Sequence, residues 1–170
     1  ALLLRGLHTG FFELWNKWIY LVSVLSMFTM TIGNVTAVSQ TNVKRLLGFS
    51  SIAQAGYILM GLCVSSEIGV TGVLIYLLAY ALTNLGAFLC VIAVSNHFGS
   101  DEIDTYAGLA QKSPFLAASL TLFLLSLAGI PPLAGFIGKL YVFASAIEGR
   151  FFTLAVVAAV NSAVAAYYYF

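Results

Sequence analysis

Apolar residues gather in long runs along the chain, and short polar stretches separate these runs. A helix that crosses the hydrocarbon core of a membrane needs about 20 mostly apolar residues. The pattern therefore predicts an all-α integral membrane protein, with about five transmembrane helices bundled in one domain over residues 1–170. Residues 1–7 are expected to be a helical stub, the end of a helix that belongs to a longer subunit. The predicted spans cover approximately residues 18–39, 46–65, 70–95, 114–147 and 151–170.

The run at residues 114–147 is too long to be one straight helix across a membrane. Such a helix would extend about 51 Å at about 1.5 Å per residue, against a hydrocarbon core of roughly 30 Å. Pro131 and Pro132 lack backbone donors, while Gly129 and Gly135 give the backbone room to unwind. We therefore predict two half-helices with an irregular joint from Gly129 to Pro132. Irregular backbone at this depth is tolerated only beside protein or a water-filled cavity.

Composition agrees with this class, with 61% hydrophobic residues, 8% charged residues and a mean hydropathy of +1.01. The net charge of +1 gives no indication of nucleic-acid binding. Cys63 and Cys90 fall inside apolar runs, which predicts buried thiols without a disulfide or metal role. Asp101, Glu102 and Asp104 lack the spacing of a calcium loop, so we expect a solvated acidic loop and no metal site.

Charge placement singles out one residue. Of the 7 basic and 6 acidic residues, all except Lys139 lie in connections or near the ends of spans. A lysine inside the membrane costs at least ~2.5–3.5 kcal/mol on insertion scales, so it is a functional candidate. A snorkelling lysine near a helix end is the alternative, but a further apolar stretch separates Lys139 from Glu148. Desolvation favours the neutral amine, which predicts an interior lysine that exchanges protons.

Other polar residues within the spans are weaker candidates. Gln54 and Tyr57 lie near one helix face, and Thr83 and Asn84 lie near the centre of the third predicted span. All four are candidates for a hydrated path. Plain helix packing explains Thr83 and Asn84 equally well, and Gln54 and Tyr57 indicate a helix that faces its neighbours rather than lipid. Gln54 cannot titrate, so it would hold water or orient a partner.

The basic pair Lys44 and Arg45 falls in a predicted connection, where positive charge anchors topology. Basic residues are divided evenly between the two ends of the predicted bundle, so the charges leave the membrane orientation open.

Three stretches resemble a known family. They are NVTAVSQTNVKRLLGFSSIAQAGYILMGL, DTYAGLAQKSPFLAASLTLFLLSLAGIPPLAGFIGKLYVF and the closing NSAVAAYYYF. They are similar to the antiporter-like membrane subunits of respiratory complex I, most closely subunit 2, the N-type subunit of bacterial NADH:quinone oxidoreductases. The resemblance covers nearly the whole chain beyond Trp18.

The resemblance implies a role for several residues. Lys139 would be the lysine of the discontinuous helix on the proton path, and Lys44 and Arg45 would lie in a loop on the side of the hydrophilic arm. Many relatives carry histidine where this chain has Gln54, which argues against a titrating role for the second span. The family's other intramembrane lysines and its glutamate would precede Ala1.

The implied function is proton translocation coupled to quinone reduction elsewhere in the complex. This chain would hold no cofactor, while flavin, iron–sulfur clusters and quinone would belong to other parts. Its partners would be other membrane subunits and the lipid of an energy-transducing membrane: the bacterial plasma membrane, the mitochondrial inner membrane or the thylakoid.

Two alternative functions stay open. One is a subunit of a multisubunit cation/proton antiporter or a related membrane-bound hydrogenase or photosynthetic complex, and the other is a structural membrane subunit without transport.

Overall fold

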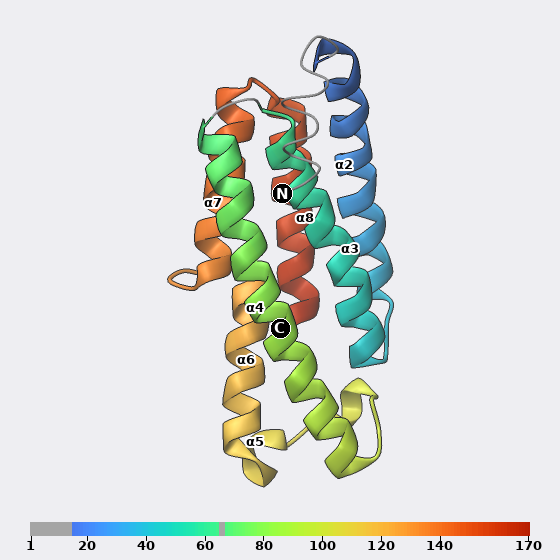
Figure 1. The fold of residues 1–170 in the computed structure, drawn as a ribbon. Helices are drawn as coiled ribbons and strands as arrows, with labels where there is room; N and C mark the ends of the chain where they lie inside the picture. The colour runs from blue at the N-terminus through green and yellow to red at the C-terminus, as the bar shows by residue number, and fades with distance from the viewer. Residues whose placement is uncertain (1–14, 65–66) are drawn as a thin grey trace.

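The computed structural model describes residues 15–64 and 67–170, and most of these residues are in helices joined by short loops (Figure 1). Within these ranges the extended pairing is one isolated bridge. The all-α prediction is therefore confirmed. The stub predicted at residues 1–7 lies outside the described residues. In chain order the elements are α2 (Trp15–Val38), α3 (Val43–Leu62), α4 (Glu67–Phe98), the 3-10 turn η2 (Ile103–Tyr106), α5 (Leu109–Lys112), α6 (Pro114–Ala128), α7 (Ala134–Glu148) and α8 (Phe152–Tyr169).

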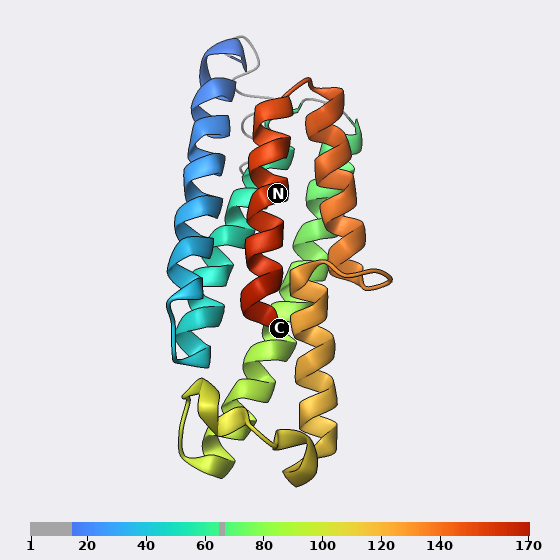
Figure 2. The ribbon, with the colours of Figure 1, turned by 180° about the vertical axis from the view of Figure 1, so that it is seen from behind.

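The long helices run side by side, and α6 and α7 stack end to end as the two halves of one broken span (Figures 1 and 2). Helix α4 packs along both halves, while α2 packs along α3 and α8. Helix α3 lies at the centre, in contact with α2, α4, α7 and α8. The loop between α6 and α7 projects sideways from the bundle about halfway along its length (Figures 1 and 2).

Among the residues that the structure describes, three helices are long and apolar enough to cross a membrane: Trp18–Val38, Ile68–Phe98 and Phe152–Tyr169. Helices α6 and α7 have 15 residues each, so neither spans the membrane alone. Helix α3 is less apolar because it faces other helices, and it buries Gln54 and Ser50. Large apolar side chains such as Leu21, Phe28 and Leu78 are exposed on the outer faces, as expected where lipid or other membrane helices are the surroundings.

The basic pair does not lie in a connection, so that prediction was wrong. Helix α3 begins at Val43, which places Lys44 and Arg45 in its first turn. The reason is Asn42, whose side-chain oxygen accepts a hydrogen bond from the Arg45 backbone N–H at 3.1 Å. An Asn N-cap satisfies one of the donors that every helix start leaves open.

The acidic loop is solvated at Glu102 and Asp104, as predicted, but Asp101 is partly buried. Asp101 forms an ion pair with Lys44 at 2.7 Å, and its side chain is 26% exposed. Lys44 also donates to Ser95 Oγ at 3.1 Å. Backbone bonds from Val43 N to the Asp101 carbonyl, at 2.9 Å, and from Ile103 N to the Thr41 carbonyl, at 2.8 Å, join the same two segments. A carboxylate beside the first turn of α3 offsets the unfavourable placement of a lysine at a helix N-terminus.

Candidate functional site: the joint between α6 and α7

The joint begins where α6 ends in a left-handed glycine. Gly129 has φ +88°, a region that favours glycine because other residues are strained there. Its N–H donates to the Ser126 carbonyl, and the Ile130 N–H donates to the Leu125 carbonyl, each at 3.1 Å. This pair of bonds is the Schellman arrangement, which closes a helix C-terminus. The predicted break at Gly129 is confirmed, and the next helix begins at Ala134.

Two consecutive prolines leave two consecutive carbonyls without their helical donors. In an α-helix the Leu127 carbonyl would accept from residue 131 and the Ala128 carbonyl from residue 132, but prolines occupy both positions. Buried side chains take over instead. Gln54 Nε2 donates to the Leu127 carbonyl at 3.2 Å. Lys139 Nζ donates to the Ala128 carbonyl at 2.9 Å.

Lys139 lies inside the bundle, as the sequence predicted, with only 5% of its surface exposed. Its Nζ stands 4.8 Å from the centroid of the Tyr57 ring, an arrangement that attracts an ammonium to the ring face. A Cβ on Gly129 would lie 2.8 Å from Lys139 Cδ, so the glycine also provides the space that the lysine stem occupies. The residue is therefore held by the joint, at the C-terminal end of α6, and does not extend toward the membrane-surface end of α7 at Glu148.

The surroundings of Lys139 suit more than one protonation state. The ion pair formed within the described residues joins Lys44 to Asp101, and Lys139 takes no part in it. An ammonium carries three donors, while a neutral amine can still donate to one carbonyl. The Ala128 carbonyl can therefore hold the side chain in both forms, while the Tyr57 ring favours only the charged one.

Two further residues fix the joint, and sequence reasoning missed both. Tyr76 is buried on α4, and its hydroxyl donates to Gln54 Oε1. Ser126 Oγ accepts from the Gly135 backbone N–H at 3.2 Å, which satisfies a donor at the start of α7. A Cβ on Gly135 would overlap the Ser126 carbonyl, so the two half-helices meet too closely for any side chain there.

The four residues considered for a hydrated path are only partly brought together. Gln54 and Thr83 line one narrow gap with Ser126 and Gly135, and in this conformation the gap has no room for a water molecule. Thr83 donates to the Ala79 carbonyl of its own helix at 2.8 Å. Asn84 and Tyr57 do not line this gap.

Tyr57 instead faces α8, where its hydroxyl accepts from Ser162 Oγ at 3.2 Å and donates to the Ala158 carbonyl at 3.4 Å. Nearby, Asn34 on α2 donates to Asn161 Oδ1 at 3.0 Å and accepts from the Tyr168 hydroxyl at 2.8 Å. Asn34 and Asn161 are both buried. Asn34, Asn161 and Tyr168 thus form a second polar group, between α2 and α8. The sequence signal for it was an asparagine within each of two apolar runs.

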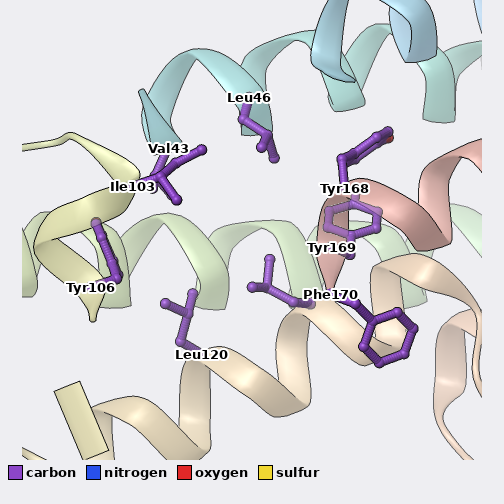
Figure 3. Close-up of a pocket in the computed structure, with 9 residues that line it drawn as sticks. Val43, Leu46, Ile103, Tyr106, Leu120, Tyr168, Tyr169 and Phe170 are labelled. Carbon is purple, nitrogen blue, oxygen red and sulfur yellow. The ribbon is translucent and has the colours of Figure 1, made fainter. Parts of the chain in front are cut away.

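A larger pocket of about 250 Å³ lies apart from the joint, between the start of α3 and the end of α8 (Figure 3). None of the side chains that line it caps a carbonyl of the joint. The lining is mostly apolar and consists of Val43, Leu46, Ile103, Tyr106, Leu120, Leu124, Tyr168, Tyr169 and Phe170.

A bundle of long apolar helices with a buried lysine at a proline-broken helix is the architecture of an integral membrane protein, in which such a lysine is a candidate functional residue. The family described as NADH:quinone oxidoreductase/Mrp antiporter, transmembrane region, matches residues 2–165. The chain therefore belongs to this family.

Individual relatives agree with the assignment. The chain is 48% identical over 169 residues to NAD(P)H-quinone oxidoreductase subunit 2 of Synechococcus sp. (strain JA-3-3Ab), an alignment that covers 99% of this chain and 32% of that protein. Among solved structures, a chain of respiratory complex I from Thermus thermophilus with bound aureothin matches with a TM-score of 0.76 and 38% identity, covering 88% of this chain and 34% of that one.

A chain of the Mrp complex from Dietzia sp. DQ12-45-1b has a TM-score of 0.82 and 29% identity, covering 90% of this chain and 29% of that one. The chain thus spans about a third of the length of the relatives it matches.

Proposed function

We propose that this chain forms part of a proton-translocating membrane subunit of NADH:quinone oxidoreductase, in which Lys139 takes up and releases the transported proton. One observation carries the proposal: Lys139 is buried at a broken helix and donates to the Ala128 carbonyl, which Pro132 has deprived of its helical donor. The match to quinone oxidoreductase subunit 2 supports the reaction assigned to the complex.

Proton movement in this chain requires no local redox chemistry. The driving change would be the arrival or departure of a charge near Lys139. At a separation of about 8 Å and an effective dielectric constant of about 20, one unit charge changes the energy of the ammonium by about 2 kcal/mol. That is more than a tenfold change in its protonation equilibrium. Flavin, iron–sulfur clusters and quinone would act in other parts of the complex, within an energy-transducing membrane.

The projecting loop between α6 and α7 supports lateral packing against other membrane segments. Pro131 and Pro132 are exposed, and the loop lies about halfway along the bundle (Figures 1 and 2). Irregular backbone does not face lipid inside the hydrocarbon region, because lipid cannot satisfy its polar groups. Protein must therefore cover this loop in the membrane, and other subunits of the complex are the partners that we propose.

A second candidate function is a subunit of a multisubunit cation/proton antiporter. The similarity to the Mrp complex, with a TM-score of 0.82, favours it. Both functions would use Lys139 in the same chemical role, so the joint does not distinguish them. Co-purification does, because an NADH:quinone oxidoreductase brings flavin-containing and iron–sulfur subunits, while an antiporter does not.

The direct test replaces Lys139 within the assembled complex reconstituted into proteoliposomes. We expect Lys139→Ala to reduce proton pumping sharply and, through tight coupling, the NADH:quinone reductase rate, with assembly largely intact. Lys112→Ala is the matched control, since Lys112 is an exposed lysine that lies against the Phe98 ring outside the joint. Pumping by Lys139→Ala at the wild-type rate would contradict the proposed function.

A further inference from the structure

The two carbonyls left open by Pro131 and Pro132 are adjacent in the chain but receive different kinds of donor. The Leu127 carbonyl accepts from a neutral amide, that of Gln54. The Ala128 carbonyl accepts from the Lys139 amine. Both carbonyls belong to buried residues, so water does not replace either donor without cost.

The orientation of the Gln54 amide follows from its partners. The Leu127 carbonyl can only accept, so the amide nitrogen of Gln54 must face it. The amide oxygen then faces the Tyr76 hydroxyl, which donates to it. Gln54 is 1% exposed and Tyr76 is 3% exposed, so solvent offers neither group another partner. Tyr76 also contacts α7, because a Cβ on Gly138 would meet its side chain and backbone.

The two donors differ in what they do when a proton moves. Gln54 carries no charge at any pH, so its bond to the Leu127 carbonyl does not depend on protonation. Lys139 changes its charge in the proposed reaction, and its bond to the Ala128 carbonyl weakens as it changes. During that change, Gln54 is the side-chain donor that continues to hold the Leu127 carbonyl, next to the Ala128 carbonyl at the end of α6.

We propose that Gln54, oriented by Tyr76, is a positioning residue that keeps the Ala128 carbonyl in place as the acceptor for Lys139. The inference rests on the proposed function and adds to it a neutral side chain that acts through the backbone. This role differs from simple packing, because it requires a side chain that donates a hydrogen bond on one side and accepts one on the other, as Gln54 does.

The test compares two substitutions of similar size in the assembled complex. Gln54→Met fills the space but cannot donate to the Leu127 carbonyl. Gln54→His can donate through one ring nitrogen and accept from Tyr76 through the other. Gln40→Leu is the matched control, because Gln40 donates to the Thr36 carbonyl, at 2.8 Å, far along the chain from the joint.

Proton pumping in proteoliposomes and hydrogen–deuterium exchange of peptides covering residues 125–139 are the two readouts. We expect Gln54→Met to assemble, to pump roughly tenfold more slowly and to exchange faster across the joint, because a buried carbonyl has lost its donor. Gln54→His should pump within about twofold of wild type, and Gln40→Leu should match wild type. Tyr76→Phe, which frees the Gln54 amide to rotate, should reduce pumping in the same direction by a smaller factor.

The inference is overturned if Gln54→Met pumps normally, if His performs as poorly as Met, or if the Met defect is only a loss of assembled complex. Lys139→Ala measured in parallel separates this inference from the function itself. If Lys139→Ala also pumps normally, the proposed function fails. If Lys139→Ala loses pumping while Gln54→Met keeps it, only the positioning role fails.

Discussion

Lys139 Nζ lies 2.9 Å from the Ala128 carbonyl oxygen, the atom whose helical donor is missing because residue 132 is proline. The break in the helix and the buried lysine are therefore one feature. The prolines create a strong acceptor deep in the bundle, and Gly129 leaves the space through which the lysine stem reaches it.

Proton pumping should depend on whether the side chain at position 139 can both take up and release a proton. We expect Lys139→Arg to pump nearly as poorly as Lys139→Ala, because guanidinium keeps its proton. Lys139→His and Lys139→Glu can still titrate and should retain part of the activity. A purely structural lysine predicts the reverse order, with arginine close to wild type. Reductase rate and proton pumping of the arginine variant in reconstituted membranes distinguish the two.

Close packing of the two half-helices should make Gly135 intolerant of any side chain. Gly135→Ala forces the Ser126 carbonyl and the start of α7 apart, and we expect a loss of stability of about 1–3 kcal/mol together with lower pumping. Gly48→Ala is the control, since beyond its own stretch of helix backbone no atom lies within 4 Å of the added Cβ. Unfolding midpoints in detergent measure the difference. Equal midpoints for the two variants would show that the joint is not tightly packed.

The sequence reveals the joint because the groups that make it are local. Proline and glycine act on their own turn of the backbone, and Lys139 stands out because it is the charged residue inside a span. The prolines, the glycines and Lys139 can each be recognised from the order of residues and the known thickness of a membrane. The predicted break therefore agrees with the structure at Gly129.

The partners of the joint could not be predicted in the same way. Gln54 and Leu127 are 73 positions apart, and Asn34 and Asn161 are 127 apart. Pairing them requires knowing which helices are neighbours and how each is rotated about its axis. Apolar runs that face lipid on one side and protein on the other carry little periodic signal for that rotation. The ion pair of Lys44 was missed because α3 begins earlier than its apolar run indicates.

The second polar group should stabilise the packing of α2 against α8. Asn34→Leu removes the donor to Asn161 Oδ1 and the acceptor for the Tyr168 hydroxyl. Asn34 also donates to the Asn161 carbonyl at 3.3 Å, so the substitution removes three hydrogen bonds to α8. Hydrogen bonds between membrane helices contribute about 0.6 kcal/mol each on average, so we expect the free energy of unfolding to fall by about 1–2 kcal/mol. Ser39→Ala, on the exposed end of the same segment, should have little effect. An unchanged unfolding midpoint for Asn34→Leu would contradict this role.

The link between the start of α3 and the acidic loop should depend on pH through Asp101. The hydrogen bond from Lys44 lowers the pKa of this carboxyl below its ordinary value, with a smaller contribution in the same direction from Ser95. A carboxyl whose pKa is lower in the folded state stabilises the fold at pH values above its unfolded pKa, and this stabilisation is lost as the pH falls through the folded pKa. Asp101→Asn should therefore lower the unfolding midpoint at neutral pH, and its difference from wild type should shrink as the pH falls below about 4.

Asp104→Asn in the same loop is the control, measured over the same range. A difference between Asp101→Asn and wild type that stays constant from pH 7 to about pH 3 would mean that the ion pair with Lys44 does not stabilise the fold.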